Sequence, residues 1–82
     1  MTPVERFRAL LRIPTISRLD TETVDWQQFD RFVTLLPQLY PGVHSSLTRE
    51  IVAEHSLLYR WEGVSADAPT LLLAHYDVVD EV

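Results

Sequence analysis

The sequence has no cysteine and only two glycines, and these absences exclude several kinds of site. Without cysteine the chain forms no disulfide, which is consistent with a cytoplasmic protein, the location we expect. Two glycines, Gly42 and Gly63, do not suffice for a glycine-rich phosphate-binding loop. No serine lies in the Gly-x-Ser-x-Gly setting of a nucleophile elbow, so a serine hydrolase has little support.

Long apolar runs and an excess of positive charge are lacking as well. No segment approaches the roughly 20 apolar residues that span a bilayer. The amino terminus interleaves charged and apolar residues, unlike a secretory signal. Seven basic residues stand against twelve acidic ones, whereas phosphate binding needs a clustered positive surface. We therefore expect neither a membrane nor a nucleic acid as a partner.

What is present suits one small globular unit or a piece of a larger domain. The 82 residues are 46% hydrophobic and 23% charged. No linker, repeat or low-complexity segment marks a boundary, so residues 1–82 are expected to belong to a single domain. A unit of this size buries only about 60% of the surface that its unfolded chain exposes, so its stability depends on another segment, a partner or a metal.

The amino-terminal residues predict a helix. Thr2 can cap it, Pro3 suits its first position, and Glu5 can complete a capping box. Pro14 restricts the preceding residue to extended geometry, so the helix should end near Arg12. Four apolar residues at spacings of three and four should form its buried face: Val4, Phe7, Leu10 and Leu11.

A second helix is expected to begin between Thr21 and Asp25. Its apolar stripe is stronger, and core packing explains the stripe better than a ligand site does. Pro37 should kink or end the helix, and Pro41-Gly42 stops what remains. The stripe comprises Trp26, Phe29, Phe32, Val33, Leu36 and Leu39.

Three strands should follow the two helices, which predicts an α/β fold. Val43–Val52 indicates a half-exposed strand, and Ser56–Glu62 alternates as a strand with one dry face does. Leu71–Ala74 has no polar alternation, which is typical of a strand covered on both faces. Residues 64–69 should form the loop between the last two strands.

A His-x-Asp pair follows the third predicted strand. Ligand sites in open α/β sheets gather beyond the carboxyl ends of strands, which is where His75 should lie. Neutral imidazole is the commonest protein ligand for zinc, and a carboxylate such as Asp77 can fix its tautomer and orientation. The pair is also compatible with two surface residues at a strand end. His44 and His55 have no ligand partner at metal spacing and are expected to be turn or surface residues.

The residues around this pair resemble a known family. The segment at residues 71–79, LLLAHYDVV, resembles the first metal-binding segment of the dinuclear-zinc metallopeptidases that include aminoacylases and the carboxypeptidase S-like, or Gly-Xaa carboxypeptidase, enzymes. Three other segments resemble the family's opening helix, second helix and preceding strand in the same order: RFRALLRIPTIS, FDRFVTLLPQLYPGVHSSL and SLLYRWEG. The resemblance spans nearly the whole chain. It implies the amino-terminal part of a three-layer α/β/α catalytic domain.

The resemblance also implies an activity and two site residues. Enzymes of this family use two zinc ions to hydrolyse an amide bond of a peptide or an N-acyl amino acid, and the complete enzyme is a possible homodimer. His75 resembles the family's first zinc ligand, and Asp77 the active-site aspartate behind it. The remaining ligands and the general base lie beyond the metal strand in such enzymes. Where the family usually has proline after two valines, this chain has Asp80; we interpret Asp80 and Glu81 as loop residues.

Two functions remain open from the sequence. One is the amino-terminal segment of a zinc hydrolase, which we expect to be inactive by itself because a catalytic zinc needs about three protein ligands. The other is a small non-catalytic α/β module that binds a partner through an exposed sheet edge. Coding sequence in frame after Val82 that carries an aspartate and then a Glu-Glu pair would favour the enzyme, and a stop codon would favour the module.

Overall fold

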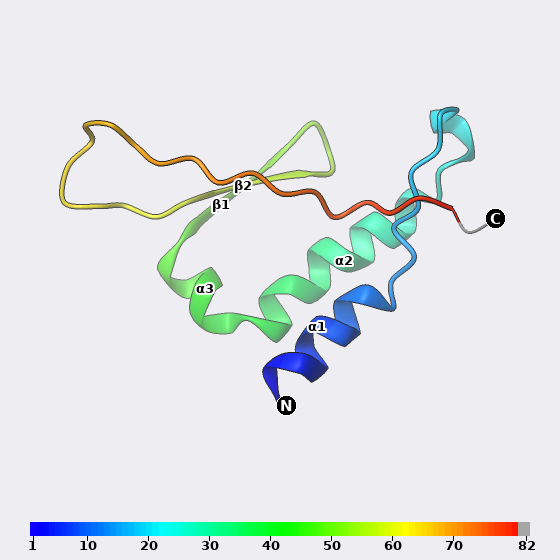
Figure 1. Cartoon of the computed structure of the whole chain (residues 1–82), viewed down its shortest axis with the longest axis horizontal. Coiled ribbons are helices and arrows are strands. Elements are labelled where there is room, and N and C mark those ends of the chain that lie inside the picture. Colours follow the sequence, from blue (N-terminus) through cyan, green and yellow to red (C-terminus); the bar gives the residue numbers. More distant parts are fainter. Residues whose placement is uncertain (81–82) are drawn as a thin grey trace.

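The computed structural model describes residues 1–80 and confirms a mixed α/β arrangement. Two helices lie side by side, and a two-stranded hairpin follows them (Figure 1). Within residues 1–80, no helix combines the length and apolarity needed to cross a membrane. The elements are α1 (Pro3–Leu11), a 3₁₀ turn (Thr21–Thr23), α2 (Trp26–Leu39), α3 (Pro41–Ser46), β1 (Thr48–Val52) and β2 (Ser56–Arg60).

Helix α1 begins with the predicted capping box. The Glu5 amide donates to the Thr2 hydroxyl at 3.2 Å, and the Glu5 carboxylate accepts from the Thr2 amide at 3.4 Å. The predicted apolar face is largely wrong, because only Leu10 of its four members is buried. Helix α2 packs against α1 on one side, and no other described element covers the rest of that face, so Val4, Phe7 and Leu11 remain exposed.

Helix α2 does not end at Pro37 but continues to Leu39. Proline lacks the N–H that would donate to the carbonyl four residues earlier, which here belongs to Val33. The Arg49 guanidinium of β1 donates to that carbonyl instead, at 3.0 Å. A side chain from the hairpin thus satisfies the acceptor that proline leaves open in the helix. Phe29 and Val33 form the buried centre of the predicted stripe.

The segment predicted as a strand from Val43 begins instead as helix α3. Pro41 occupies its first turn, and a strand forms only from Thr48. The His44 ring holds the helix in place, because Nδ1 lies 2.7 Å from the Tyr40 carbonyl and Nε2 lies 2.7 Å from the Tyr59 hydroxyl. A carbonyl only accepts, so Nδ1 carries the proton, and Nε2 of the neutral ring accepts from Tyr59.

Strands β1 and β2 pair antiparallel, with Glu50 opposite Leu58. The tight turn between them places two non-glycine residues in the left-handed region, Ala53 at φ 51° and Glu54 at φ 73°. The predicted alternation of β2 is confirmed, since Leu57 and Tyr59 are half-buried while their neighbours are exposed. The strand ends at Arg60 rather than at Glu62.

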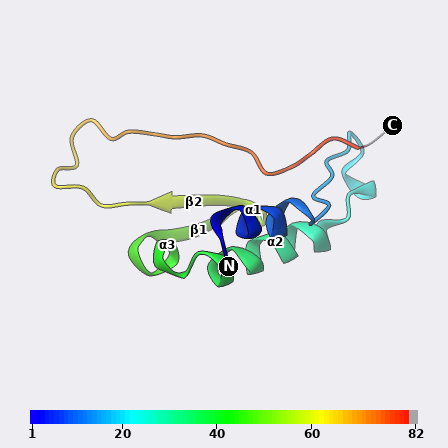
Figure 2. The same ribbon diagram turned by 60° about the horizontal axis from the view of Figure 1, so that its bottom comes forward.

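The third predicted strand, Leu71–Ala74, is wrong for this structure. The segment is extended but pairs with neither strand of the hairpin, and its leucines are 71%, 89% and 86% exposed. A strand buried on both faces needs neighbours on each side, and residues 1–80 supply none there. Figure 2 shows the segment running apart from β2, on the side away from α2. The radius of gyration is 14.7 Å, against about 12 Å for a compact domain of this length.

Candidate metal-ligand site

A short parallel pairing holds the residues that follow the exposed leucines. Ile16 and Val78 form a parallel bridge. The Val78 amide donates to the Thr15 carbonyl at 2.8 Å, and the Ser17 amide donates to the Val78 carbonyl at 2.9 Å. Thr15 is only 2% exposed, and its hydroxyl donates to the Tyr76 carbonyl at 2.6 Å. The loop after α1 therefore serves as the partner strand of the His-x-Asp segment.

Tyr76 fixes the same segment from its other side. Its ring stacks on Phe32, with centroids 4.7 Å apart, and meets Phe29 edge to face at 5.5 Å. Its hydroxyl donates to the His55 carbonyl in the β1–β2 turn. Burial raises the pKa of the Tyr76 hydroxyl, and the carboxylates of Asp30 and Asp77 raise it further, so the group remains a donor. The sequence analysis did not single out Tyr76. Its position between His75 and Asp77 could have indicated it, because alternate side chains of an extended segment point to opposite faces.

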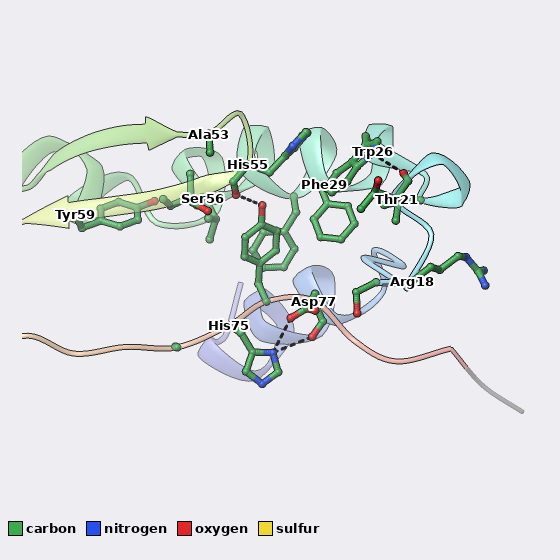
Figure 3. A pocket seen from close by; sticks show the side chains of 17 residues that line it. Arg18, Thr21, Trp26, Phe29, Ala53, His55, Ser56, Tyr59, His75 and Asp77 are labelled. Atoms are coloured by element: carbon green, nitrogen blue, oxygen red, sulfur yellow. Dashed lines mark hydrogen bonds and ion pairs between the residues drawn. The ribbon is translucent and has the colours of Figure 1, made fainter.

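His75 and Asp77 form the predicted pair. His75 Nδ1 lies 2.9 Å from Asp77 Oδ1 and 3.1 Å from the Asp77 carbonyl oxygen (Figure 3). Both oxygens only accept hydrogen bonds, so the proton of a neutral imidazole is on Nδ1. The lone pair is then on Nε2, and the side chain is 85% exposed. Among residues 1–80, no hydrogen bond reaches this nitrogen.

The Asp77 carboxyl is held in its charged form. The Ser17 hydroxyl is the largest cause that lowers the pKa of Asp77, and the His75 imidazole is the next. Both stabilise the carboxylate that accepts from Nδ1. Beyond the pair, the Asp80 carboxylate forms an ion pair with the Arg18 guanidinium at 2.6 Å. Asp80 thus has a partner at the position for which the sequence analysis noted the departure from proline. Glu81 lies outside the described residues.

A pocket of about 710 Å³ opens between α2, the β1–β2 turn and the His-x-Asp segment. Its walls include Trp26, Phe29, His55, His75 and Asp77. The His55 ring stacks on Trp26 with centroids 4.5 Å apart, and its Nε2 lies 3.1 Å from Asp30 Oδ1. His55 is therefore engaged in packing, as His44 is in α3. Neither His44 nor His55 has Nδ1 held by a carboxylate with an exposed Nε2, which is the arrangement at His75.

His75 with Asp77 has the chemistry of one zinc ligand with its orienting acid. A zinc site needs more than one such ligand. Within residues 1–80, no three histidine or carboxylate side chains gather closely enough to hold a metal ion. The described residues therefore fit part of a zinc site and do not complete one.

Curated proteins with similar sequences carry names that agree with this chemistry. The chain is 36% identical over 75 residues to a probable carboxypeptidase S-like protein of Dictyostelium discoideum, and 33% identical over 78 residues to a second one. It is 39% identical over 79 residues to an uncharacterized carboxypeptidase of Schizosaccharomyces pombe.

These matches cover most of this chain and little of the relatives. They include 89%, 92% and 90% of the chain, respectively, but the chain spans only 13 to 16% of the relatives' own length. No protein-family model matches the chain. No solved structure matches it either. The similarity is thus to a small part of proteins that are named carboxypeptidases.

Proposed function

We propose that this chain provides the first metal ligand and its orienting acid for a zinc-dependent hydrolase of amide bonds in peptides or N-acyl amino acids. His75 is the ligand and Asp77 the acid. One observation carries the proposal. The side-chain carboxylate and the backbone carbonyl of Asp77 both accept from His75 Nδ1, so the lone pair is on Nε2 of an exposed side chain. This is the arrangement of a histidine that binds zinc through Nε2.

Two further findings support the proposal. The relatives that match most of this chain are named carboxypeptidases, and the match extends over nearly the whole sequence. The His-x-Asp segment is also fixed along its backbone edge by Thr15 and on one face by Tyr76, so the backbone that carries the ligand has a defined position. A ligand must be held in this way before metal arrives if binding is to be tight.

A zinc ion supplies a Lewis acid that activates water and polarises the amide carbonyl. Two such ions and the remaining ligands belong, in this proposal, to a larger three-layer α/β/α catalytic domain. Because residues 1–80 hold one complete ligand arrangement at most, we expect the 82-residue chain to release no amino acid from a peptide by itself.

A zinc titration of the ¹⁵N-labelled chain tests the assignment of His75. We expect the ring nitrogens of His75 to shift first and saturably, because Nε2 is accessible there. His44 and His55 serve as internal references, since the rings of both are engaged by neighbours. Because the described residues do not complete a zinc site, zinc is added to millimolar concentration, about the range of a weak single-ligand contact. Shifts of equal size in all three histidines, or larger shifts in His44 or His55 than in His75, would contradict the proposal.

Two variants sharpen this titration. His75→Ala should abolish the saturable response. Asp77→Asn should weaken zinc binding by about tenfold or more, since it replaces the carboxylate that accepts the hydrogen bond from His75 Nδ1. Asp67→Asn is the matched control, because Asp67 is an exposed aspartate in the 64–69 loop, remote from the pair. Equal losses for Asp77→Asn and Asp67→Asn would show a general charge effect rather than a role in orienting the ligand.

A non-catalytic interaction module is the second candidate. It is favoured by the two-stranded sheet, whose edges have no strand partner within residues 1–80, and by the exposed leucines at 71–73. The zinc titration separates the two functions, because a module that binds only through its sheet edge has no need of a selective metal response at His75.

A further inference from the structure

The residue between the metal ligand and its acid points the opposite way from both. His75 and Asp77 meet each other on one side of the extended segment, while Tyr76 packs among Phe29 and Phe32 on the other. Alternation along an extended chain forces this division. The contacts of the Tyr76 side chain therefore restrain the backbone between His75 and Asp77.

Ring stacking alone leaves the phenol free to slide within its contacts. Stacked and edge-to-face pairs are satisfied over a range of offsets, whereas a hydrogen bond fixes one atom against another. The Tyr76 hydroxyl supplies that fixed point by donating to the His55 carbonyl. This acceptor belongs to the backbone of the β1–β2 turn, and its position is set by two left-handed residues, Ala53 and Glu54.

The turn is itself held against α2. The His55 ring stacks on Trp26 at 4.5 Å, and its Nε2 lies 3.1 Å from the Asp30 carboxylate. The carbonyl that receives the Tyr76 hydroxyl thus lies on a turn that is attached to the first half of α2. A continuous series of contacts runs from the helix through the turn and the phenol to the backbone at His75.

We propose that Tyr76 is a positioning residue for the metal ligand, with its hydroxyl on the His55 carbonyl setting the location and orientation of His75. The assignment rests on the proposed function of His75. In this role the hairpin is a support for the ligand, and the phenol transmits the position of its turn to the site.

Tyr76→Phe tests the proposal because it keeps the ring and removes only the hydroxyl. Tyr59→Phe is the matched control, since it also removes only a hydroxyl, one that forms a hydrogen bond with His44 Nε2. Each variant loses one hydrogen bond made by a phenol hydroxyl, but only Tyr76 belongs to the His-x-Asp segment. Thermal unfolding, recorded for both, shows how much general stability each loss removes.

The readouts are zinc affinity and, without metal, the ¹⁵N shifts of the His75 ring at fixed pH, which report where its proton resides. We expect Tyr76→Phe to weaken zinc binding about three- to tenfold and to move the ring shifts toward a mixture of tautomers. We expect Tyr59→Phe to change zinc affinity by no more than about twofold and to leave the His75 ring shifts unchanged, although it also loses the hydrogen bond of a phenol hydroxyl.

Three results would overturn the proposal. They are unchanged His75 shifts in Tyr76→Phe, equal changes in both variants, or changes that merely follow the loss of stability. Should Tyr76→Phe unfold, Tyr76→Trp, which retains a ring donor, must restore folding together with the His75 shifts. If His75 of the wild-type chain responds to zinc no more than His44 and His55 do, the proposed function fails, whereas the metal-free shifts still decide the role of Tyr76.

Discussion

Two halves of one short segment behave in opposite ways. Leu71, Leu72 and Leu73 are the most apolar run near the site, yet they are extended and largely exposed. Tyr76 and Val78, only a few residues later, are held by hydrogen bonds to the loop after α1 and to the β1–β2 turn. The more polar half of the segment is the half with a fixed position.

The difference shows what apolar composition does and does not determine. Burial of leucine is favourable only where other groups exclude water, and residues 1–80 leave these three side chains largely uncovered. The second half has directional partners: a backbone ladder to Thr15 and Ser17, and a hydroxyl contact to His55. Such contacts specify position even in a chain with a small core.

The largest test of this comparison removes the ring on which the second half rests. Phe29→Ala should lower the free energy of unfolding by about 3 kcal/mol or more, because Phe29 is 5% exposed and contacts Tyr76, Trp26 and His55. Chemical denaturation measures the loss. Phe7→Ala is the control, since Phe7 is 57% exposed and should cost far less. Equal losses would mean that the aromatic cluster is not the core.

Thr15→Val should have the next largest effect. The two side chains have nearly the same shape, but valine cannot donate to the Tyr76 carbonyl, which is left without its partner. We expect a loss of about 1–2 kcal/mol and faster amide hydrogen exchange at Val78. Thr70→Val, at an exposed position outside the ladder, should leave both unchanged. Slow exchange at Val78 in Thr15→Val would show that the ladder holds without the hydroxyl.

A smaller effect is expected from acid. The pKa of Asp77 lies below its usual value of 3.8. The contribution of its carboxylate to the free energy of unfolding is therefore fully present above 3.8 and is lost as the pH falls through the lowered pKa. The Asp77 side-chain carbonyl resonance in a ¹³C titration should therefore have a midpoint below 3.8. Ser17→Ala should raise this midpoint, because it removes the largest cause of the shift. A midpoint at or above the usual value would contradict the hydrogen bonding described for the carboxylate.

The smallest effect is expected at the exposed leucines. Leu72→Ser should change the free energy of unfolding by no more than about 0.5 kcal/mol, because Leu72 is 89% exposed. Leu10→Ser, at a buried leucine of α1, is the contrasting variant and should be strongly destabilising. A loss above about 1 kcal/mol for Leu72→Ser would show that this side chain is covered in solution, and the comparison between the two halves would then collapse.

Local signals in the sequence predicted most elements. The capping box at Thr2 and Glu5, the stripe through Phe29 and Val33, and the alternation at Leu57 and Tyr59 each depend on neighbours within a few residues, and the structure confirms them. Two failures depend on neighbours that residues 1–80 do not supply: the strand at Leu71–Ala74 needs flanking strands, and the apolar face of α1 needs a further packing partner. The strand expected from Val43 fails because these residues begin as helix α3. The continuation of α2 to Leu39 agrees with the expectation that Pro41-Gly42 stops what remains after Pro37.

The candidate site divides in the same way. Spacing alone suggested that Asp77 could orient His75, and the structure places their side chains 2.9 Å apart. Their roles as ligand and orienting acid remain predictions. The pairing of Ile16 with Val78 and the contact of Tyr76 with His55 join residues 62 and 21 positions apart, so no local pattern announces them. These distant contacts fix where the predicted pair lies.

Pro37 and Arg49 have a consequence for how this sequence can vary. Proline opens an acceptor in α2, and the arginine occupies it, so neither residue is independent of the other. An ordinary residue at position 37 would supply its own N–H to the Val33 carbonyl and release the arginine from that contact. Loss of the arginine alone would leave the carbonyl without this donor. In related chains, substitutions at positions 37 and 49 should therefore occur together. Such paired substitution would be a trace, in the sequences themselves, of the contact between the hairpin and the helix.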